Sequence, residues 1–243
     1  MRVKTSQIQI FTVNSNHNIT QGSEQLTQLL ISEVNIAVNS GANFSLAISG
    51  GNSPAKLFEL WTTKYATAIE WEKIALYWVD ERSVPPDHHE SNYGNAKRLL
   101  LDKVPLLNDN IYRIFGENDP KEEADRYSKQ ALINLPHANG FPVFDMVILG
   151  VGDDGHTSSI FPGQQDLLTS DKPFAPSVNP NSGQKRVAMT GNTVKYAKRP
   201  LYFINGISKS DAVEKLLNMK DNPEYPAAWL TRYMREPFIF WDR

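Results

Sequence analysis

A histidine follows two aspartates and an apolar run in the stretch FDMVILGVGDDGHTSSIFPG, residues 144–163. Imidazole changes its protonation near neutral pH, so it is well suited to accept a proton from water. His156 lies two residues after Asp154, across one glycine, and the carboxylate can curl back to accept a hydrogen bond from a ring nitrogen. Such a bond fixes the tautomer and stabilises the protonated ring. The spacing predicts a general base, His156, oriented by Asp154.

The same stretch contains GVGDDG, which matches the dinucleotide-binding fingerprint G-x-G-x-x-G. That fingerprint must open a helix, and an acid should close the next strand about 20 residues further on. Here Asp153 and Asp154 fall inside the fingerprint, where they would oppose a pyrophosphate, and Pro162 and Gly163 interrupt any long helix. We therefore reject dinucleotide binding.

Two other interpretations of this stretch need to be weighed, a structural histidine and a serine nucleophile. A single histidine is often a purely structural residue, which is the alternative for His156. Ser158 and Ser159 lack the G-x-S-x-G elbow of a serine nucleophile. We expect these serines to cap the following helix instead.

A glycine turn, SGGNSP at 49–54, separates an apolar run from a helical pattern. Gly50 and Gly51 allow a ligand to approach the backbone closely, and Ser53 and Pro54 suit the start of a helix. A strand, a glycine turn and a helix N-terminus together favour an anion site. A capped turn without a ligand is the alternative.

The segment VDERSVPPDHHESN, residues 79–92, brings charge to the end of a predicted strand. Arg82 could neutralise an anionic substrate or a developing oxyanion there, although a solvated loop would have the same composition. The run from Asp87 through His88 and His89 to Glu90 contains metal-ligand types. Adjacent histidines point in different directions on most backbones, so we predict no metal site.

Short apolar runs rich in β-branched and aromatic residues alternate with amphipathic patterns along the chain. Several runs are continuously apolar, as strands covered on both faces are. This alternation predicts an α/β fold: a doubly wound, mostly parallel, Rossmann-like sheet with helices on both faces, in a single domain over 1–243. The polar, proline-rich segment 163–184 is expected to be a long loop over a site. The expected strands are 7–13, 44–49, 74–80, 111–115, 144–150, 186–190, 200–206 and 237–242, and the expected helices are 22–38, 53–66, 120–135 and 208–219.

Composition removes several classes of function. The 243 residues carry a formal net charge of −2 and no cysteine. The charge gives no reason to expect nucleic acid or an anionic membrane as a partner, and disulfides, thiolate metal sites and a cysteine nucleophile are excluded. No apolar run is long enough to span a bilayer, and the first residues do not form a secretory signal. We expect a soluble cytoplasmic protein, and a monomer because no large apolar stripe is evident.

Three motifs in order resemble the 6-phosphogluconolactonase family. They are SGGNSP, then W-x-x-x-x-x-YWVDERSVP with a later SN, then FDMVILGVGDDGHTSSIFPG. Order and spacing agree from about residue 40 to residue 163, and a weaker likeness continues through KRVAMT and GISKSDAV to the final WDR. Each motif alone is weak, but the ordered set is specific.

The resemblance implies hydrolysis of 6-phospho-D-glucono-1,5-lactone to 6-phosphogluconate in the pentose phosphate pathway, without metal or cofactor. The partner is then a small phosphosugar lactone, and the fold is related to that of glucosamine-6-phosphate deaminase. The implied catalytic residues are His156, Asp154 and Arg82. The implied substrate-binding residues are Gly50, Gly51, Asn52, Ser53, Asp80, Gly152, Arg186 and Lys209.

The sister deaminases differ at one position that carries chemistry. They have D-G-H-I-A-F-N-E-P-G where this chain has DGHTSSIFPG, so their ring-opening glutamate falls on Phe161, which cannot move a proton. The chain also departs from the lactonase pattern: Val187 and Ala188 follow Arg186 where Thr or Ser is frequent, which puts the phosphate ligands in doubt. A deaminase and a non-catalytic phosphosugar-binding module remain the alternatives.

Overall fold

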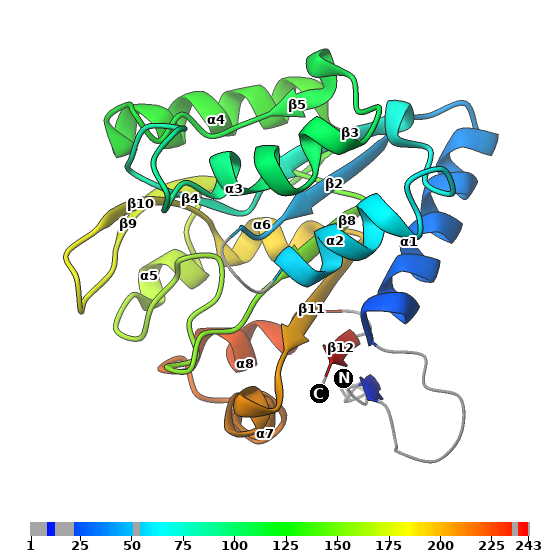
Figure 1. Ribbon diagram of the computed structural model, residues 1–243. Helices are drawn as coiled ribbons and strands as arrows, with labels where there is room; N and C mark the ends of the chain where they lie inside the picture. The colour runs from blue at the N-terminus through cyan, green and yellow to red at the C-terminus, as the bar shows by residue number, and fades with distance from the viewer. Residues whose placement is uncertain (1–8, 13–21, 51–53, 235–237, 243) are drawn as a thin grey trace.

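The computed structural model describes residues 9–12, 22–50, 54–234 and 238–242. Gly51, Asn52 and Ser53 of the predicted anion turn lie outside these ranges. Seven strands form the central sheet in the order β1-β12-β11-β8-β2-β3-β5, and every pair is parallel (Figure 1). The predicted doubly wound, parallel sheet is thereby confirmed. The strands are β1 (Gln9–Thr12), β2 (Phe44–Ile48), β3 (Ile74–Trp78), β5 (Ile111–Tyr112), β8 (Met146–Leu149), β11 (Arg199–Asn205) and β12 (Phe238–Asp242).

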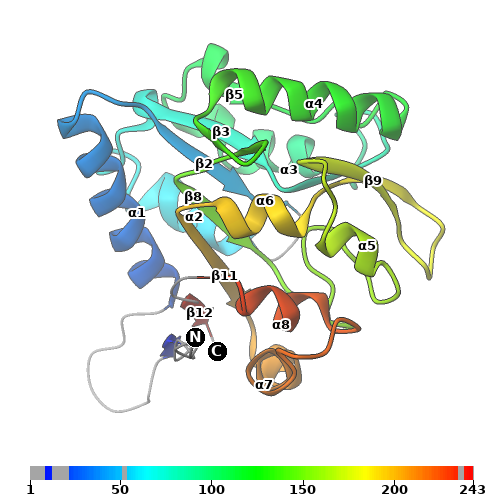
Figure 2. The ribbon, with the colours of Figure 1, turned by 180° about the vertical axis from the view of Figure 1, so that it is seen from behind.

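Helices cover both faces of this sheet, as predicted. α2 and α3 lie in front of it in Figure 1, and α6 and α8 lie in front when the molecule is turned round in Figure 2. All residues of β2 and β8 are buried, which explains their continuously apolar sequence. Among the described helices, none combines the length and apolar character that a bilayer crossing requires. The helices are α1 (Gly22–Asn39), α2 (Ala55–Thr63), α3 (Asn92–Leu99), α4 (Pro120–Asn134), α5 (Gln165–Leu168), α6 (Gly191–Tyr196), α7 (Ser210–Asn218) and α8 (Pro226–Thr231).

A second, antiparallel sheet lies beside the first and was not expected. It has the order β4-β10-β9, with β4 at Asp80–Arg82, β9 at Phe174–Val178 and β10 at Lys185–Met189. The prediction of a long loop over 163–184 is therefore wrong, because the segment contains α5 and β9. A proline and alternating burial hide β9 from a search for continuous apolar runs. A short hairpin, β6 (His137–Ala138) with β7 (Phe141–Pro142), completes the described strands.

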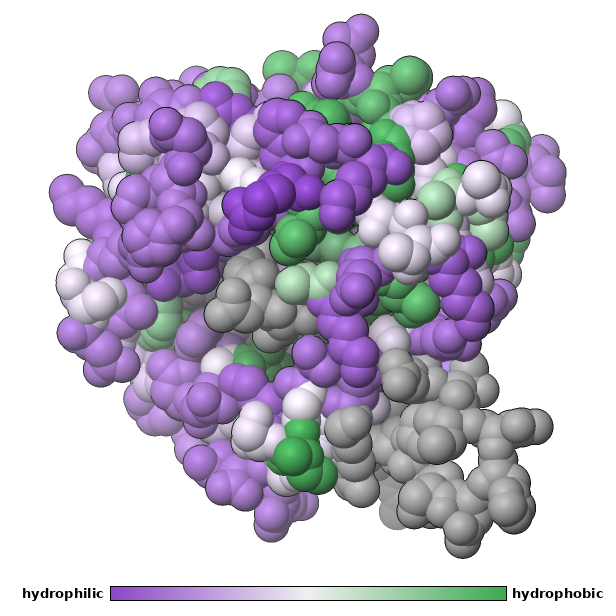
Figure 3. All heavy atoms as spheres, viewed as in Figure 1, coloured by the Kyte–Doolittle hydropathy of each residue, from purple (hydrophilic) through white to green (hydrophobic). Residues whose placement is uncertain are grey.

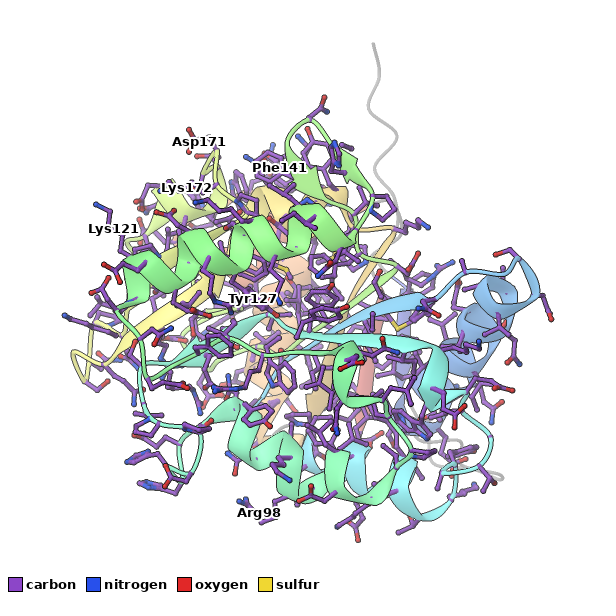
Figure 4. The ribbon with its side chains drawn as sticks, turned by 90° about the horizontal axis from the view of Figure 1, so that it is seen from above. Arg98, Lys121, Tyr127, Phe141, Asp171 and Lys172 are labelled. Carbon is purple, nitrogen blue, oxygen red and sulfur yellow. The ribbon has the colours of Figure 1, made fainter. Side chains whose placement is uncertain are left out.

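The tyrosine Tyr127 of α4 connects this helix with the central sheet. Figure 4 shows it on the side of α4 that faces the strands, whereas Lys121 lies at the outer end of the helix. Its hydroxyl accepts a hydrogen bond from the Trp78 N–H at 3.0 Å and donates one to the Tyr112 carbonyl at 2.8 Å. Tyr127 thus satisfies backbone groups of β3 and β5 where these strands end.

Candidate active site

A cleft opens at the point where the winding of the sheet reverses. From β2 the chain proceeds outward through β3 to β5, and from β8 it proceeds the other way through β11 to β12. The connections that follow the carboxyl ends of β2 and β8 therefore run in opposite directions, which is where α/β sheets bind ligands. The cleft has a volume of about 370 Å³. Of the predicted site residues, it brings together Gly50, Asp80, Arg82, Gly152, His156, Arg186 and Lys209.

His156 and Asp154 form the predicted pair. Nδ1 of His156 lies 2.6 Å from Oδ1 of Asp154, and the same oxygen accepts the backbone N–H of His156 at 3.1 Å. Burial raises the pKa of Asp154, but the hydrogen bond and charge of His156 outweigh burial and place this pKa below the usual value. The carboxylate therefore stays charged and fixes Nδ1, which leaves Nε2 as the ring nitrogen for a substrate or water.

The turn that carries His156 is not followed directly by a helix. The Gly152 N–H donates to the His156 carbonyl at 2.9 Å, and the Gly155 N–H donates to the Gly152 carbonyl at 2.9 Å. GVGDDG thus fails the demand that a dinucleotide fingerprint open a helix. Because the Gly152 N–H is already engaged, it is not free to bind an oxyanion.

Ser158 and Ser159 do not cap a helix, which corrects the expectation from sequence. Both have positive φ, 50° and 58°, and the next helix starts only at Gln165, without a side-chain cap. The Ser158 hydroxyl donates to the carbonyl of Val79 at 2.9 Å, and the Ser159 hydroxyl donates to Oδ2 of Asp80. The two serines therefore attach the His156 loop to the strand that carries Arg82.

Arg82 and Arg186 are direct cross-strand partners in the antiparallel sheet. Nη1 of Arg82 donates to the Glu90 carbonyl. Nη1 of Arg186 donates to the Ser159 hydroxyl at 3.2 Å, and its Nη2 donates to Oε1 of Gln184 at 3.0 Å. Within the described residues, the buried Nε of each arginine has no hydrogen-bond partner. Two guanidinium groups with unused donors on one cleft favour an anionic ligand.

Burial disfavours the charged form of the Arg186 guanidinium unless an anion lies beside it. Desolvation lowers its pKa, and the Asp80 carboxylate opposes this effect only in part. Oδ2 of Asp80 lies 3.8 Å from Nη1 of Arg186 and also accepts from Ser159. Since Arg82 repels Arg186, a bound anion would relieve the repulsion between them.

Phe161 lies where the resemblance places the sister family's glutamate. It is only 1% exposed. Its ring centroid lies 4.6 Å from that of His156, and the Arg186 guanidinium carbon lies 5.5 Å from it. The aromatic ring therefore contacts both the predicted base and a predicted anion ligand, and it offers no proton.

Glu81 holds the backbone of Arg82 in place, and the sequence analysis assigned it no function. Its carboxylate is buried and accepts the N–H groups of Arg82, Asn92 and Tyr93 at 2.7–2.8 Å and the Ser91 hydroxyl at 3.1 Å. Burial raises its pKa, and the three N–H donors oppose that effect. Glu81 thus fixes the start of α3 against the strand end that carries Arg82.

Asn92 is a second site residue that sequence reasoning left without a role. Its Nδ2 donates to the Asp80 carbonyl at 2.8 Å, and its buried Oδ1 has no partner among the described residues. A Cβ at Gly50 would lie 2.2 Å from Cγ of Asn92, so only glycine fits there. The Ser91-Asn92 pair at the end of the segment 79–92 was the available signal. The other lining residues that were not predicted are Ser49, Gly150, Val151, Thr157, Ser158 and Ser159.

Lys209 reaches the cleft from the loop after β11. Its Nζ donates to Oδ1 of Asp153 at 2.7 Å and to the Val151 carbonyl at 3.3 Å. The Asp153 side chain is 82% exposed, so this ion pair is screened by water and contributes little. The ammonium group can therefore exchange Asp153 for a ligand anion at small cost.

Comparison with known proteins shows the family of this chain. Residues 18–239 match the family described as glucosamine-6-phosphate isomerases/6-phosphogluconolactonase. A 6-phosphogluconolactonase of Haemophilus influenzae is 40% identical over 186 residues, which are 75% of this chain and 78% of that protein. One of Treponema pallidum is 31% identical over 80% of both chains.

Solved structures share the fold over nearly the whole length. The crystal structure of devB protein superposes with a TM-score of 0.82 at 36% identity and covers 96% of each chain. The 6-phosphogluconolactonase of Trypanosoma cruzi gives a TM-score of 0.80 at 24% identity, covering 97% of this chain and 94% of that one, which supports the fold alone. This chain belongs to the glucosamine-6-phosphate isomerase/6-phosphogluconolactonase family.

Proposed function

We propose that this protein is an enzyme that hydrolyses 6-phospho-D-glucono-1,5-lactone to 6-phospho-D-gluconate in the pentose phosphate pathway. The single observation that carries the proposal is His156, which is hydrogen-bonded to Asp154 and lines one cleft with Arg82 and Arg186. The lactonase names of the relatives support the same reaction. The buried phenylalanine Phe161 disfavours the sister reaction, because amino-sugar ring opening needs a proton carrier at that position.

In the proposed mechanism, Nε2 of His156 takes a proton from water, and the resulting hydroxide attacks C1 of the lactone. Arg82 stabilises the tetrahedral oxyanion, because it lines the cleft and the N–H of Gly152 is already engaged. The C1–ring oxygen bond then breaks, and protonated His156 returns its proton to that oxygen. Asp154 stabilises the imidazolium between the two transfers.

The 6-phosphate would be held by other groups of the same cleft. Gly50, Arg186 and Lys209 line the cleft and can supply donors, together with Gly51, Asn52 and Ser53, for which the role stays a prediction. Charged hydrogen bonds of this kind contribute about 1.5–3 kcal/mol each. Asp80 would act through Arg186, because its carboxylate is engaged by protein donors.

Hydrolysis of this lactone needs only a modest rate enhancement from the enzyme. A lactone is an activated ester that already opens slowly in water, and a positioned general base supplies about 10²–10⁴-fold. No step of this mechanism needs a metal ion or a covalent nucleophile. The positions of His156 and Asp154 support this mechanism.

The test generates the lactone with glucose-6-phosphate dehydrogenase and follows its disappearance against buffer alone. The wild-type protein should accelerate the loss, and His156→Gln should abolish most of that acceleration. His137→Gln is the matched control, because His137 is exposed on the short hairpin and does not line the cleft. Equal rates in His156→Gln and wild type would refute the mechanism, and ammonia release from glucosamine 6-phosphate would favour the deaminase.

A single domain, a monomeric state and a cytoplasmic location stay predictions. One core cluster extends over the described chain from Leu26 to Trp241, which supports a single domain. Figure 3 shows a mostly hydrophilic face, which supports the monomer. Size-exclusion chromatography with light scattering would test the monomer.

A further inference from the structure

The loop between β4 and α3 gathers three metal-ligand side chains away from His156. The rings of His88 and His89 lie side by side, with centroids 4.3 Å apart and planes at 36°. This corrects the expectation that neighbouring histidines point apart. One ligand atom from each ring and one carboxylate oxygen of Glu90 lie within 4.8 Å of one another. Within the described residues, this is the group of His, Asp and Glu side chains whose spacing fits a metal ion.

Hydrogen bonds along the backbone hold this arrangement in place. The His88 N–H donates to the Pro85 carbonyl at 3.0 Å, and the Ser91 N–H donates to the His88 carbonyl at 3.0 Å. Arg82 donates to the Glu90 carbonyl from the cleft side. These backbone contacts do not use the imidazole Nε2 atoms. Nδ1 of His88 accepts the Glu90 N–H at 3.2 Å, and Oε2 of Glu90 accepts from Gln184. Little ordering is left for an ion to impose on the backbone.

The donor set selects a chemical class of ion. Two imidazoles and one carboxylate suit borderline transition metals such as Zn²⁺, Ni²⁺ and Cu²⁺, whereas Mg²⁺ and Ca²⁺ prefer sites made of oxygen. Metal–nitrogen bonds are about 2.0–2.1 Å long, so the ligand atoms of a tetrahedral site lie about 3.4 Å apart. The ligand atoms now lie within 4.8 Å of one another, and side-chain rotation must bring them closer around an ion.

We propose that His88, His89 and Glu90 form a surface site for one divalent transition-metal ion, with water at the remaining positions. The site is separate from the His156–Asp154 pair, which is not part of the group. It lies next to the cleft, because Oε2 of Glu90 accepts from Nε2 of Gln184 at 2.9 Å, and Gln184 in turn accepts from Arg186. The ion has no part in the proposed hydrolysis.

The experiment titrates untagged, chelator-treated protein with Ni²⁺ by calorimetry and with Cu²⁺ by electron paramagnetic resonance. Wild type should bind one equivalent of each ion, with nitrogen hyperfine structure on the copper signal, and Mg²⁺ should give no heat. His88→Gln combined with His89→Gln should weaken binding at least about tenfold, and Glu90→Gln should weaken it less. Circular dichroism melts check that each variant is folded.

Two single variants test whether the metal ion binds at a different histidine. His137→Gln controls for an exposed histidine elsewhere, and His156→Gln controls for binding at the cleft; both should retain the wild-type affinity. The proposal is overturned if the double variant binds like wild type, if His156→Gln alone loses the ion, or if wild type binds neither ion. These readouts do not depend on lactone hydrolysis.

Discussion

Gly152 lies so close to His156 that any side chain at position 152 would displace the imidazole ring. A Cβ built there would lie 2.2 Å from Nδ1 of His156 and 2.6 Å from Oδ1 of Asp154. The glycine is therefore needed for close approach to the two side chains of the pair, and not for a nucleotide phosphate.

Gly152→Ala should separate positioning from folding. The added methyl group must push the imidazole out of place, and a misplacement of about 1 Å can cost about 10²-fold in rate. We expect kcat to fall by about 10–100-fold while the melting temperature changes little, because the pair is partly exposed. Steady-state kinetics and thermal melts measure both effects. Gly150→Ala is the matched control, since the nearest atom to its Cβ would be 3.9 Å away; an equal loss there would contradict the steric argument.

Asp154→Asn should retain the shape of the pair and remove its charge. The amide can accept the hydrogen bond from Nδ1 only in one orientation, and it cannot stabilise the imidazolium. We expect kcat to fall by about 10²-fold, at the lower end of what a general base supplies, with KM nearly unchanged. A large rise in KM with unchanged kcat would instead assign Asp154 to substrate binding.

The charge of Asp154 also gives a pH dependence of stability. Its pKa is lowered in the folded protein, so the carboxylate stabilises the fold above the unfolded pKa of about 3.9 and loses that contribution as pH falls through the lower, folded value. The difference in melting temperature between wild type and Asp154→Asn should therefore shrink below about pH 4. Melts recorded from pH 6 downward test this. A difference that shrinks only as pH rises would have the wrong sign.

The central sheet was predictable because its strands are buried on both faces and therefore apolar throughout. β2, β8 and β11 were found within one or two residues at most ends. β9 was not, since Ala175 and Pro176 lie in a half-exposed strand whose pairing is set by β10, far along the chain. Strands that depend on a distant partner leave little local signal.

The candidate site was predictable where function depends on residues near in sequence. His156 and Asp154 are two residues apart, and the spacing alone predicted their contact. The alignment of Arg82 opposite Arg186 depends on strand register across 104 residues, so no local pattern could show it. The function of Glu81 could not be predicted for another reason. Its carboxylate accepts buried N–H groups at the start of α3, and the sequence does not show that α3 packs against this strand.

Arg186→Lys should weaken substrate binding more than it slows chemistry. Lysine keeps the charge, but it cannot reach Ser159, Gln184 and a phosphate at the same time with a planar group. We expect KM to rise about 10–100-fold, which corresponds to one lost charged hydrogen bond, and kcat to change much less. Lys185→Gln is the control, because Lys185 precedes it on β10 and is exposed. A loss confined to kcat would place Arg186 at the reacting carbon.

Glu81→Gln should destabilise the fold beneath the cleft. The two carboxylate oxygens accept four donors, and a glutamine amide would turn its own N–H groups toward two of them. Each buried donor left without an acceptor costs about 1–3 kcal/mol, so the free energy of unfolding should fall by at least that amount in urea titrations. Glu59→Gln, on the exposed side of α2, should change it by no more than about 0.5 kcal/mol. Because Arg82 donates its own N–H to Glu81, kcat should fall as well even under conditions where the variant is fully folded. A variant as stable as wild type would show that α3 does not depend on this carboxylate.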